Sequence, residues 1–137
     1  MQHIDSPTAL RAVLEDAGCA VRDQTACSCP LKSHDGWASV TEAHWPREQM
    51  AALGSLRDAE ATEPSYAEWH PRGSRYDSAD APVAVGWFPY NRCELHRCGR
   101  CGVAVMRYTE FGGYYVDHRA RRVDAGLVDD SAPAPAP

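Results

Sequence analysis

The sequence predicts a small α+β domain, with short helices early in the chain and a mostly antiparallel sheet after them. Two observations favour this class. Apolar residues recur at helical spacing near the N-terminus, and later runs rich in Val and aromatic residues are separated by Pro- and Gly-containing turns. The length of 137 residues is typical of one domain. We therefore expect one domain over residues 1–130, and a disordered Ala/Pro tail over 131–137.

The first expected element is a helix over residues 7–17. Ser6 is a suitable N-cap, and Pro7 occupies the first helical position, where its missing N–H costs nothing. Gly18 ends the apolar stripe. A second, short helix is expected over 47–53, because Pro46 precedes it and Gly54 follows it.

Most of the remaining expected elements are strands. Phe111, Gly112 and Gly113 predict a turn between two strands, since glycine adopts positive φ without strain. The other expected elements are a strand at 37–41, a hairpin of 65–70 with 74–77 about Pro71-Arg72-Gly73, a most buried strand at 81–88, hairpin arms at 103–110 and 114–119, and a short helix within 120–128.

One decapeptide concentrates the metal-binding residue types. It contains Cys93, His96, Cys98 and Cys101, and Gly102 follows the last cysteine. Two thiolates separated by two residues can face one metal from a tight turn, and the glycine lets the backbone bend. The C-x-x-C-G pattern, with the hairpin after it, resembles the zinc-ribbon knuckle over residues 93–119. This resemblance implies one structural zinc, a closed site without a catalytic role.

The fourth ligand is not fixed by the spacing. A ribbon usually has a second, distant pair of ligands, whereas Cys93 lies only five residues before Cys98. His96 completes a compact set with the three cysteines. The alternatives are Cys27 or Cys29, brought near by the fold, and His118 on the second arm of the hairpin.

A second metal is compatible with the same cysteines. Cys93, Cys98 and Cys101 match the C-x4-C-x2-C spacing of plant-type [2Fe–2S] ferredoxins. That cofactor needs a later cysteine, and no cysteine follows Cys101. The bulky residues of 94–97 also suit a cluster-wrapping loop poorly. Zinc is therefore preferred, with [2Fe–2S] or thiol redox chemistry at Cys27 and Cys29 as the alternative.

No catalytic signature accompanies the metal site. The sequence has no Gly-rich phosphate loop, no G-x-S-x-G and no H-E-x-x-H. We therefore expect a non-catalytic binding module.

Adjacent tyrosines on a strand cannot both face the core, and Tyr and Arg are favoured at interfaces. The predicted contact patch consists of Arg107, Phe111, Tyr114, Tyr115 and Arg119.

The net charge of the chain indicates which class of partner to expect. The formal net charge of −5 argues against a surface devoted to nucleic acid or to anionic membranes, so a protein partner is expected. Seven arginines lie within 92–122, however, and a nucleic-acid reader remains the alternative. The N-terminus has no secretory pattern and no apolar run is long enough to span a membrane, so we expect a cytoplasmic location.

Overall fold

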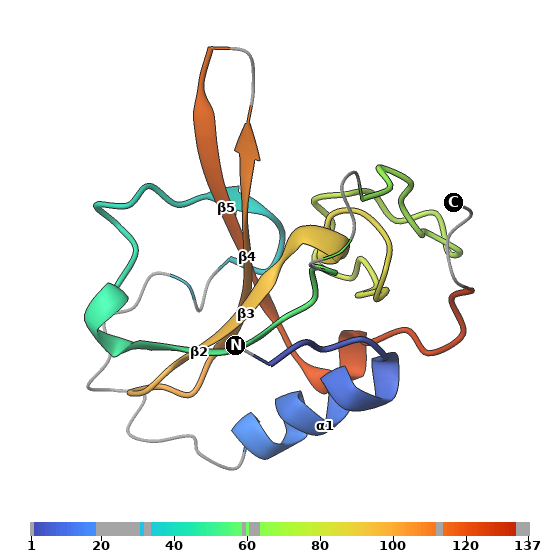
Figure 1. The fold of residues 1–137 in the computed structure, drawn as a ribbon, viewed down its shortest axis with the longest axis horizontal. Coiled ribbons are helices and arrows are strands. Elements are labelled where there is room, and N and C mark those ends of the chain that lie inside the picture. The colour runs from blue at the N-terminus through green and yellow to red at the C-terminus, as the bar shows by residue number, and fades with distance from the viewer. Residues whose placement is uncertain are drawn as a thin grey trace.

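The computed structural model describes residues 2–18, 31, 34–58, 60, 64–111 and 114–133. Within these residues one N-terminal helix accompanies a five-stranded antiparallel sheet, which confirms the α+β class (Figure 1). No helix in the described part of the chain is long and apolar enough to cross a membrane.

The N-terminal helix, α1 (Pro7–Gly18), forms as its sequence predicts. The Ser6 hydroxyl accepts a hydrogen bond from the Ala9 amide at 3.1 Å, which satisfies one of the unpaired donors of the first turn. Leu10 and Leu14 point into the core from one side of the helix. The helix therefore lies with its apolar stripe against the sheet domain rather than as a free extension.

The sheet has the strand order β1-β5-β4-β3-β2, so β4 is central. All neighbouring strands are antiparallel. β3, β4 and β5 follow one another in the chain, whereas a long segment without strands separates β2 from β3. The strands are β1 (Ala38–Ser39), β2 (Met50–Ser55), β3 (Glu94–Cys98), β4 (Ala104–Phe111) and β5 (Val116–Val123), and the 3-10 turns are η3 (Arg47–Gln49), η4 (Tyr90–Arg92) and η5 (Ala125–Leu127).

Each face of the sheet is covered by its own apolar cluster, because successive strand side chains alternate between faces. On β4, Met106 and Tyr108 belong to the main cluster, which also holds Leu10 and Leu14 of α1. Val105 belongs to a second cluster, built with Val40 and Trp45. We call these the main cluster and the second cluster.

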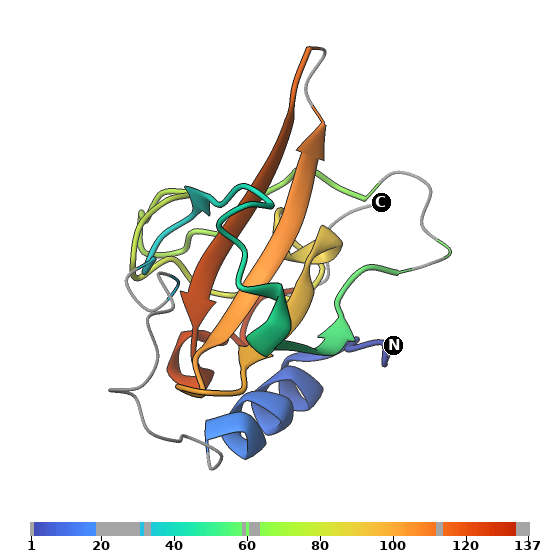
Figure 2. The ribbon, with the colours of Figure 1, turned by 90° about the vertical axis from the view of Figure 1, so that its left-hand side faces the viewer.

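The β4–β5 hairpin extends well beyond the other strands. β4 pairs with β5 from Ala104↔Val123 to Phe111↔Val116, whereas β3 accompanies β4 only as far as Glu94↔Arg107. The end of the hairpin consequently projects from the body of the molecule, as two views at right angles show (Figures 1 and 2). The predicted hairpin is confirmed.

The helix predicted over 47–53 is wrong. Only η3 is helical there, and residues from Met50 onward form the edge strand β2, paired with β3 from Met50↔Cys98 to Ser55↔Glu94. The intrinsic helix preference of so short a segment is weak, and the sheet pairing overrides it.

The hairpin predicted over 65–77 and the strand predicted over 81–88 are also wrong. Between 64 and 89 the structure has turns and bends, with one isolated bridge at Val83 to Val128. Prolines recur through this segment and cannot donate ladder hydrogen bonds. The helix predicted within 120–128 is replaced by the end of β5 and by η5, whereas the strand predicted at 37–41 survives as the two residues of β1.

Candidate functional site

The four predicted metal ligands do not converge in the structure. Because β3 is a strand rather than a loop, its side chains alternate between the two faces of the sheet. Cys93 and Leu95 lie in the main cluster, whereas Cys98 and Cys101 lie in the second cluster. The structure therefore separates Cys93 from the C-x-x-C pair, and the C-x4-C-x2-C spacing does not assemble three thiols for either zinc or [2Fe–2S].

Cys93 has the environment of a core thiol. Its side chain is fully buried and its Sγ donates a hydrogen bond to the Pro89 carbonyl at 3.1 Å. Burial raises the pKa of the Cys93 thiol well above its ordinary value. The Cys93 sulfur thus has its own hydrogen-bond acceptor in the main cluster, apart from Cys98 and Cys101 in the second cluster.

Cys98 and Cys101 lie at the two ends of one tight turn. The Gly102 amide donates to the Cys98 carbonyl at 2.9 Å, and the Cys98 amide donates to the Val103 carbonyl at 2.9 Å. Gly102 has φ +79°, a left-handed conformation that glycine adopts without strain. Both cysteines are buried in the second cluster beside Leu31. This pair fits half of a tetrahedral zinc site.

The candidate histidine ligands are otherwise engaged. His96 stacks edge-on to Trp45 at 5.2 Å between ring centroids, and its Nε2 lies 3.3 Å from Glu94 Oε1. His118 pairs with Thr109 in the hairpin ladder, and its Nδ1 lies 3.1 Å from Thr109 Oγ1. The described residues contain no group of three or more His, Cys, Asp or Glu side chains placed to hold a metal ion. Cys27 and Cys29 lie outside these residues.

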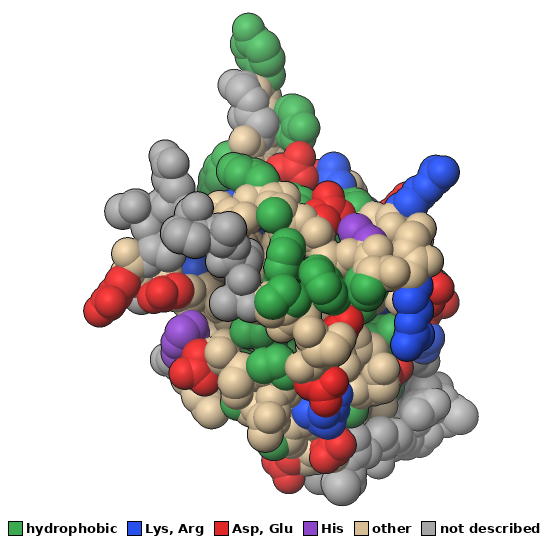
Figure 3. All heavy atoms as spheres, turned by 90° about the vertical axis from the view of Figure 1, so that its right-hand side faces the viewer, with side chains coloured by type: hydrophobic (Ala, Val, Ile, Leu, Met, Phe, Trp, Pro, Cys, Tyr) green, Lys and Arg blue, Asp and Glu red, His purple; other side chains and the backbone are tan. Residues whose placement is uncertain are grey.

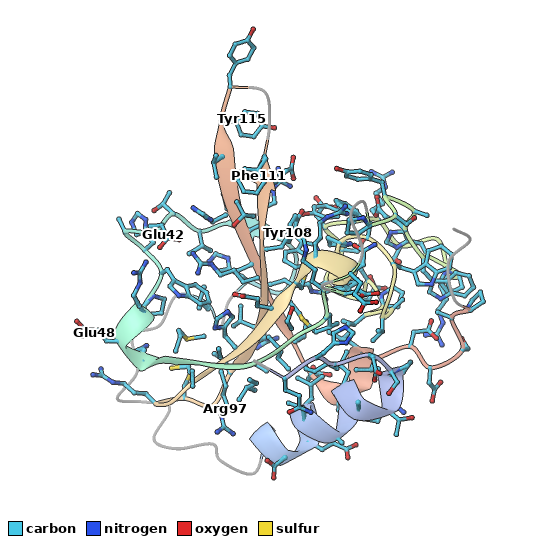
Figure 4. All side chains as sticks on the ribbon, in the orientation of Figure 1. Glu42, Glu48, Arg97, Tyr108, Phe111 and Tyr115 are labelled. Atoms are coloured by element: carbon cyan, nitrogen blue, oxygen red, sulfur yellow. The ribbon has the colours of Figure 1, made fainter. Side chains whose placement is uncertain are left out.

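The tip of the hairpin carries four of the five exposed large apolar side chains of the described residues; the fifth, Tyr66, lies elsewhere. Phe111 is 79% exposed, Tyr114 is fully exposed, and Tyr115 and Val116 are each 56% exposed. Figure 4 places Phe111 and Tyr115 near the outer end of the projecting hairpin, and Figure 3 shows hydrophobic side chains at that end. The three aromatic members of the predicted patch are therefore brought together at the tip.

The two arginines of that patch lie nearer the body and have intramolecular partners. The Arg107 guanidinium lies 4.2 Å above the Trp45 ring and pairs with Glu42. Arg119 Nε lies 2.9 Å from Asp117 and 3.3 Å from Glu110. These contacts leave the aromatic tip as an uncharged surface, distinct from the arginines that the sequence grouped with it.

Other arginines of the 92–122 stretch are also held within the fold. Arg121 is fully buried and donates to the Tyr90 hydroxyl and to the carbonyls of Ala79 and Ala81. Arg122 pairs with Asp35 at 2.5 Å. Charges already engaged in this way contribute less to an external phosphate contact.

A cleft of about 1080 Å³ opens at the base of the hairpin. One of its walls is Arg92, whose guanidinium lies 4.3 Å from the centre of the Tyr66 ring and 4.9 Å from that of Phe88. Arg92 also donates to the carbonyls of Pro64 and Ser65. The lining residues are Glu42, Ser55, Arg57, Pro64, Tyr66, Glu68, Tyr76, Phe88, Arg92, Glu94, Arg107, Tyr108, Thr109, Glu110, Phe111, His118 and Arg119.

Three of the residues that line the cleft are joined by hydrogen bonds. The phenols of Tyr76 and Tyr108 share a hydrogen bond, and Arg119 donates to the Tyr76 hydroxyl at 3.4 Å. Burial raises the pKa of both tyrosines, so both are neutral phenols near pH 7. Sequence patterns do not reveal this cleft, because Tyr66, Tyr76 and Phe88 come from a segment without periodic strands and no local spacing connects them to β4.

Comparison with models of known families, with characterised proteins and with solved structures gives no match to this chain. Its function must therefore be argued from its own residues.

Proposed function

We propose that this protein is a non-catalytic, zinc-stabilised binding module that contacts a protein partner through the tip of its β4–β5 hairpin. The observation that carries the proposal is the cluster of exposed apolar side chains at that tip. Phe111, Tyr114, Tyr115 and Val116 lie together at one projecting end of the domain, whereas the other large apolar residues of the described chain, apart from Tyr66, are buried or partly buried.

The chemistry of the tip supports a protein partner over nucleic acid. Residues 111–116 carry no charged side chain, and the chain as a whole has a formal net charge of −5. Nucleic-acid affinity depends on cations that neutralise phosphates. Tyrosine and phenylalanine instead supply contact area at protein interfaces, where they are frequent hot spots. The arginines at the base of the hairpin already have partners within the molecule, which also favours a protein partner over nucleic acid.

The zinc is proposed to be held by Cys98 and Cys101 together with ligands still to be identified. Both cysteines are buried at the two ends of a glycine-containing turn, an arrangement that lets two thiolates face one metal. Among the candidates from the sequence, Cys27 and Cys29 precede Leu31, which packs in the same cluster as the pair. A metal there would stabilise the second cluster, which is the smaller of the two.

A photo-crosslinking experiment tests the binding proposal. A photoreactive phenylalanine analogue replaces Tyr114 at the tip in one variant and the exposed Arg72, on the 71–73 turn, in a matched control. Both variants are irradiated in lysate of the source cells. We expect position 114 to give a discrete cross-linked product that nuclease does not remove, and position 72 to give none.

Two results contradict the proposal. A product at position 114 that nuclease removes supports the nucleic-acid alternative. Equal cross-linking from positions 114 and 72 shows that the tip is no more a contact surface than an ordinary turn. Metal analysis of the protein purified without chelator tests the zinc separately, with about one zinc per chain expected for a single closed site.

A further inference from the structure

The C-terminal segment of the chain is held against two tryptophans. Trp69 and Trp87, which we call the tryptophan pair, contact each other at 5.2 Å between ring centroids, with an interplanar angle of 44°. Both side chains are only partly buried. Trp87 Nε1 donates to the Pro133 carbonyl at 2.7 Å, and Trp69 Nε1 donates to Asp129 at 2.8 Å. The pair thus already binds a carbonyl of a proline-containing segment, which belongs to the chain itself.

Asp129 fixes the start of that segment. One of its carboxylate oxygens accepts from the Trp69 indole, and the other accepts from the amide and the hydroxyl of Ser131, at 2.8 and 2.6 Å. The Asp129 amide in turn donates to the Val83 carbonyl at 2.9 Å. The chain is therefore secured to the body as far as Ser131, and Pro133 can leave Trp87 without breaking any pairing of the sheet.

Pro133 is held less firmly than Ser131. It is exposed, and its contact with Trp87 is a neutral hydrogen bond that solvent can reach. Such a bond favours the bound over the solvated segment by roughly two- to tenfold. On this basis the Trp87 indole is free for a fraction of the time on the order of one tenth to one third. A competing segment can therefore reach it.

The chemistry of the tryptophan pair suits a proline-rich, extended segment. An indole N–H can only donate, so it needs an acceptor such as a carbonyl. A polyproline-II segment has no internal hydrogen bonds, which leaves its carbonyls available to such a donor. Its proline rings pack on aromatic side chains, and it loses little conformational freedom on binding. The sequence from Ser131 to Pro137 alternates alanine with proline, so the present occupant comes from a segment of this composition.

The tryptophan pair lies apart from the tip of the β4–β5 hairpin. In Figure 1 the C-terminal end lies to the right of the body, whereas the tip projects above it. Figure 3 views that right-hand side and shows hydrophobic side chains gathered in the middle of the face, below the tip. A partner bound at this face need not touch the hairpin.

We propose that the tryptophan pair is a docking site for a proline-rich, extended segment of a partner protein, which displaces Pro133 from Trp87. The displaced segment stays anchored to Asp129 through Ser131. This goes beyond the proposed function, because it uses a surface separate from the tip and involves no metal.

The indole N–H signals of the four tryptophans provide the test by NMR. Two end-capped nine-residue peptides, alanine alternating with proline and alanine alternating with glycine, are each titrated into the full chain. We expect the alanine–proline peptide to shift the Trp69 and Trp87 signals with a dissociation constant below about 5 mM, and the alanine–glycine peptide to bind at least about fivefold more weakly. The Trp37 and Trp45 signals should not move, because these side chains are buried in the two apolar clusters.

Pro133→Gly tests the displacement in the full chain. Glycine makes the released segment more flexible, which disfavours its bound state by about two- to fivefold. The alanine–proline peptide should then bind about two- to threefold more tightly, because it meets less competition. Pro46→Gly is the matched control. It makes the same change next to η3, at the opposite end of the molecule from the C-terminus in Figure 1, and should leave the affinity unchanged.

Trp87→Phe, made in the Pro133→Gly chain, identifies the hydrogen-bond donor. Phenylalanine keeps an aromatic ring but has no N–H, so the alanine–proline peptide should bind at least about twofold more weakly. The background is chosen because the chain's own segment uses the same donor, and its loss would otherwise offset part of the effect. Tyr114→Phe in the same background removes a hydroxyl from the fully exposed tip and should change nothing.

Any of the following results overturns the proposal: no shift of the Trp69 and Trp87 signals at about 10 mM alanine–proline peptide, equal shifts with both peptides, equal affinities of the Pro133→Gly and Pro46→Gly chains, or equal affinities of the Trp87→Phe and Tyr114→Phe chains. A dimer by sedimentation, with a Trp87 signal that changes with protein concentration, would instead assign the site to a second copy. None of these results alters the cross-link expected at position 114, so the proposed function is judged separately.

Discussion

Arg121 is a charged residue whose role is to organise the core. It is fully buried on β5, and its guanidinium donates to three neutral oxygens, on Tyr90, Ala81 and Ala79. These acceptors lie on the irregular segment that covers the main cluster. A single side chain therefore ties that segment to the sheet, in a place where backbone pairing is limited to one bridge.

Replacing Arg121 by alanine should destabilise the fold strongly. The change leaves a cavity and removes the hydrogen bonds of two buried acceptors, on Tyr90 and Ala81, and of the Ala79 carbonyl, at a cost of about 3 kcal/mol or more. Urea unfolding followed by tryptophan fluorescence measures it. The control is Arg122→Ala, which removes an ion pair to Asp35 whose side chains are about half exposed, and should cost less than about 1 kcal/mol. Similar losses in the two variants would show that the buried network contributes little.

The cysteines of the decapeptide should divide into two classes. Cys93→Ala removes a buried sulfur from the main cluster, so we expect a loss of about 1 kcal/mol with the zinc content unchanged. Cys98→Ser and Cys101→Ser should each lose the zinc and lower the unfolding midpoint more than Cys93→Ala does. Metal analysis and thermal unfolding of the three variants test this division into two classes. If Cys93→Ala alone loses the metal, the separation of the two faces is irrelevant to ligation.

At the scale of elements, the edge strand β2 is held by a close approach to the N-terminal segment. A Cβ added at Gly54 would lie 2.8 Å from Ile4 Cδ1 and 3.0 Å from the Gln2 carbonyl oxygen. Ile4 is fully buried, and its amide bonds to the Ser55 carbonyl. The glycine is thus required for packing of residues 2–4 along β2.

Gly54→Ala should therefore be destabilising. The methyl group would force the Ile4 side chain and the backbone at Gln2 to move, with an expected cost of about 1–3 kcal/mol. Chemical denaturation gives the value. Gly99→Ala is the matched control, because its added Cβ would meet only the Gln49 carbonyl oxygen at 3.4 Å, and it should change stability by less than about 0.5 kcal/mol. A neutral Gly54→Ala would mean that residues 2–4 adjust without loss.

Elements with strong local signals were predicted correctly from the sequence, and elements that depend on distant partners were not. The N-cap and apolar stripe of α1, and the glycine turn between the arms of β4 and β5, involve residues close together in the chain. The strand β2 was mistaken for a helix because its partner, β3, comes about forty residues later. Propensity in a six-residue segment is too weak to decide against such pairing.

The candidate site was predictable only in part, for a related reason. The exposed tip followed from two adjacent tyrosines near a turn, which cannot both face a core. Cys93 could not be separated from Cys98 and Cys101, because β3 is buried on both faces and its residues show no apolar–polar alternation. The spacing in the sequence therefore predicted a single site from side chains that point to opposite sides of the sheet.

At the scale of the whole molecule, the C-terminus secures the irregular segment that follows β2. Trp69 Nε1 donates to Asp129 at 2.8 Å, Trp87 Nε1 donates to the Pro133 carbonyl at 2.7 Å, and the two indoles contact each other at 5.2 Å between centroids. Residues 131–133 of the predicted tail thus make defined contacts, while 134–137 lie outside the described residues. These side-chain contacts and the Val83–Val128 backbone bridge join the irregular segment to the C-terminal segment.

Truncating the chain after Asp130 should therefore weaken the domain, whereas truncation after Pro133 should leave it unchanged. The shorter chain loses the hydrogen bonds of Ser131 and Pro133, worth about 1 kcal/mol net. The hydrogen bond from Ser131 is the main cause of the lowered pKa of Asp129, so this pKa should rise toward its ordinary value of 3.8 in an NMR titration.

The pH dependence of that loss follows from the direction of the shift. A carboxyl whose pKa is lowered in the folded state stabilises the protein above its unfolded pKa, and this contribution disappears as the pH falls through the folded value. The stability difference between the two truncations should accordingly be full at pH 7 and shrink below about pH 4. Urea unfolding of both chains at a series of pH values measures it. A difference that is constant down to pH 2 would assign the loss to the Trp87 contact rather than to Asp129.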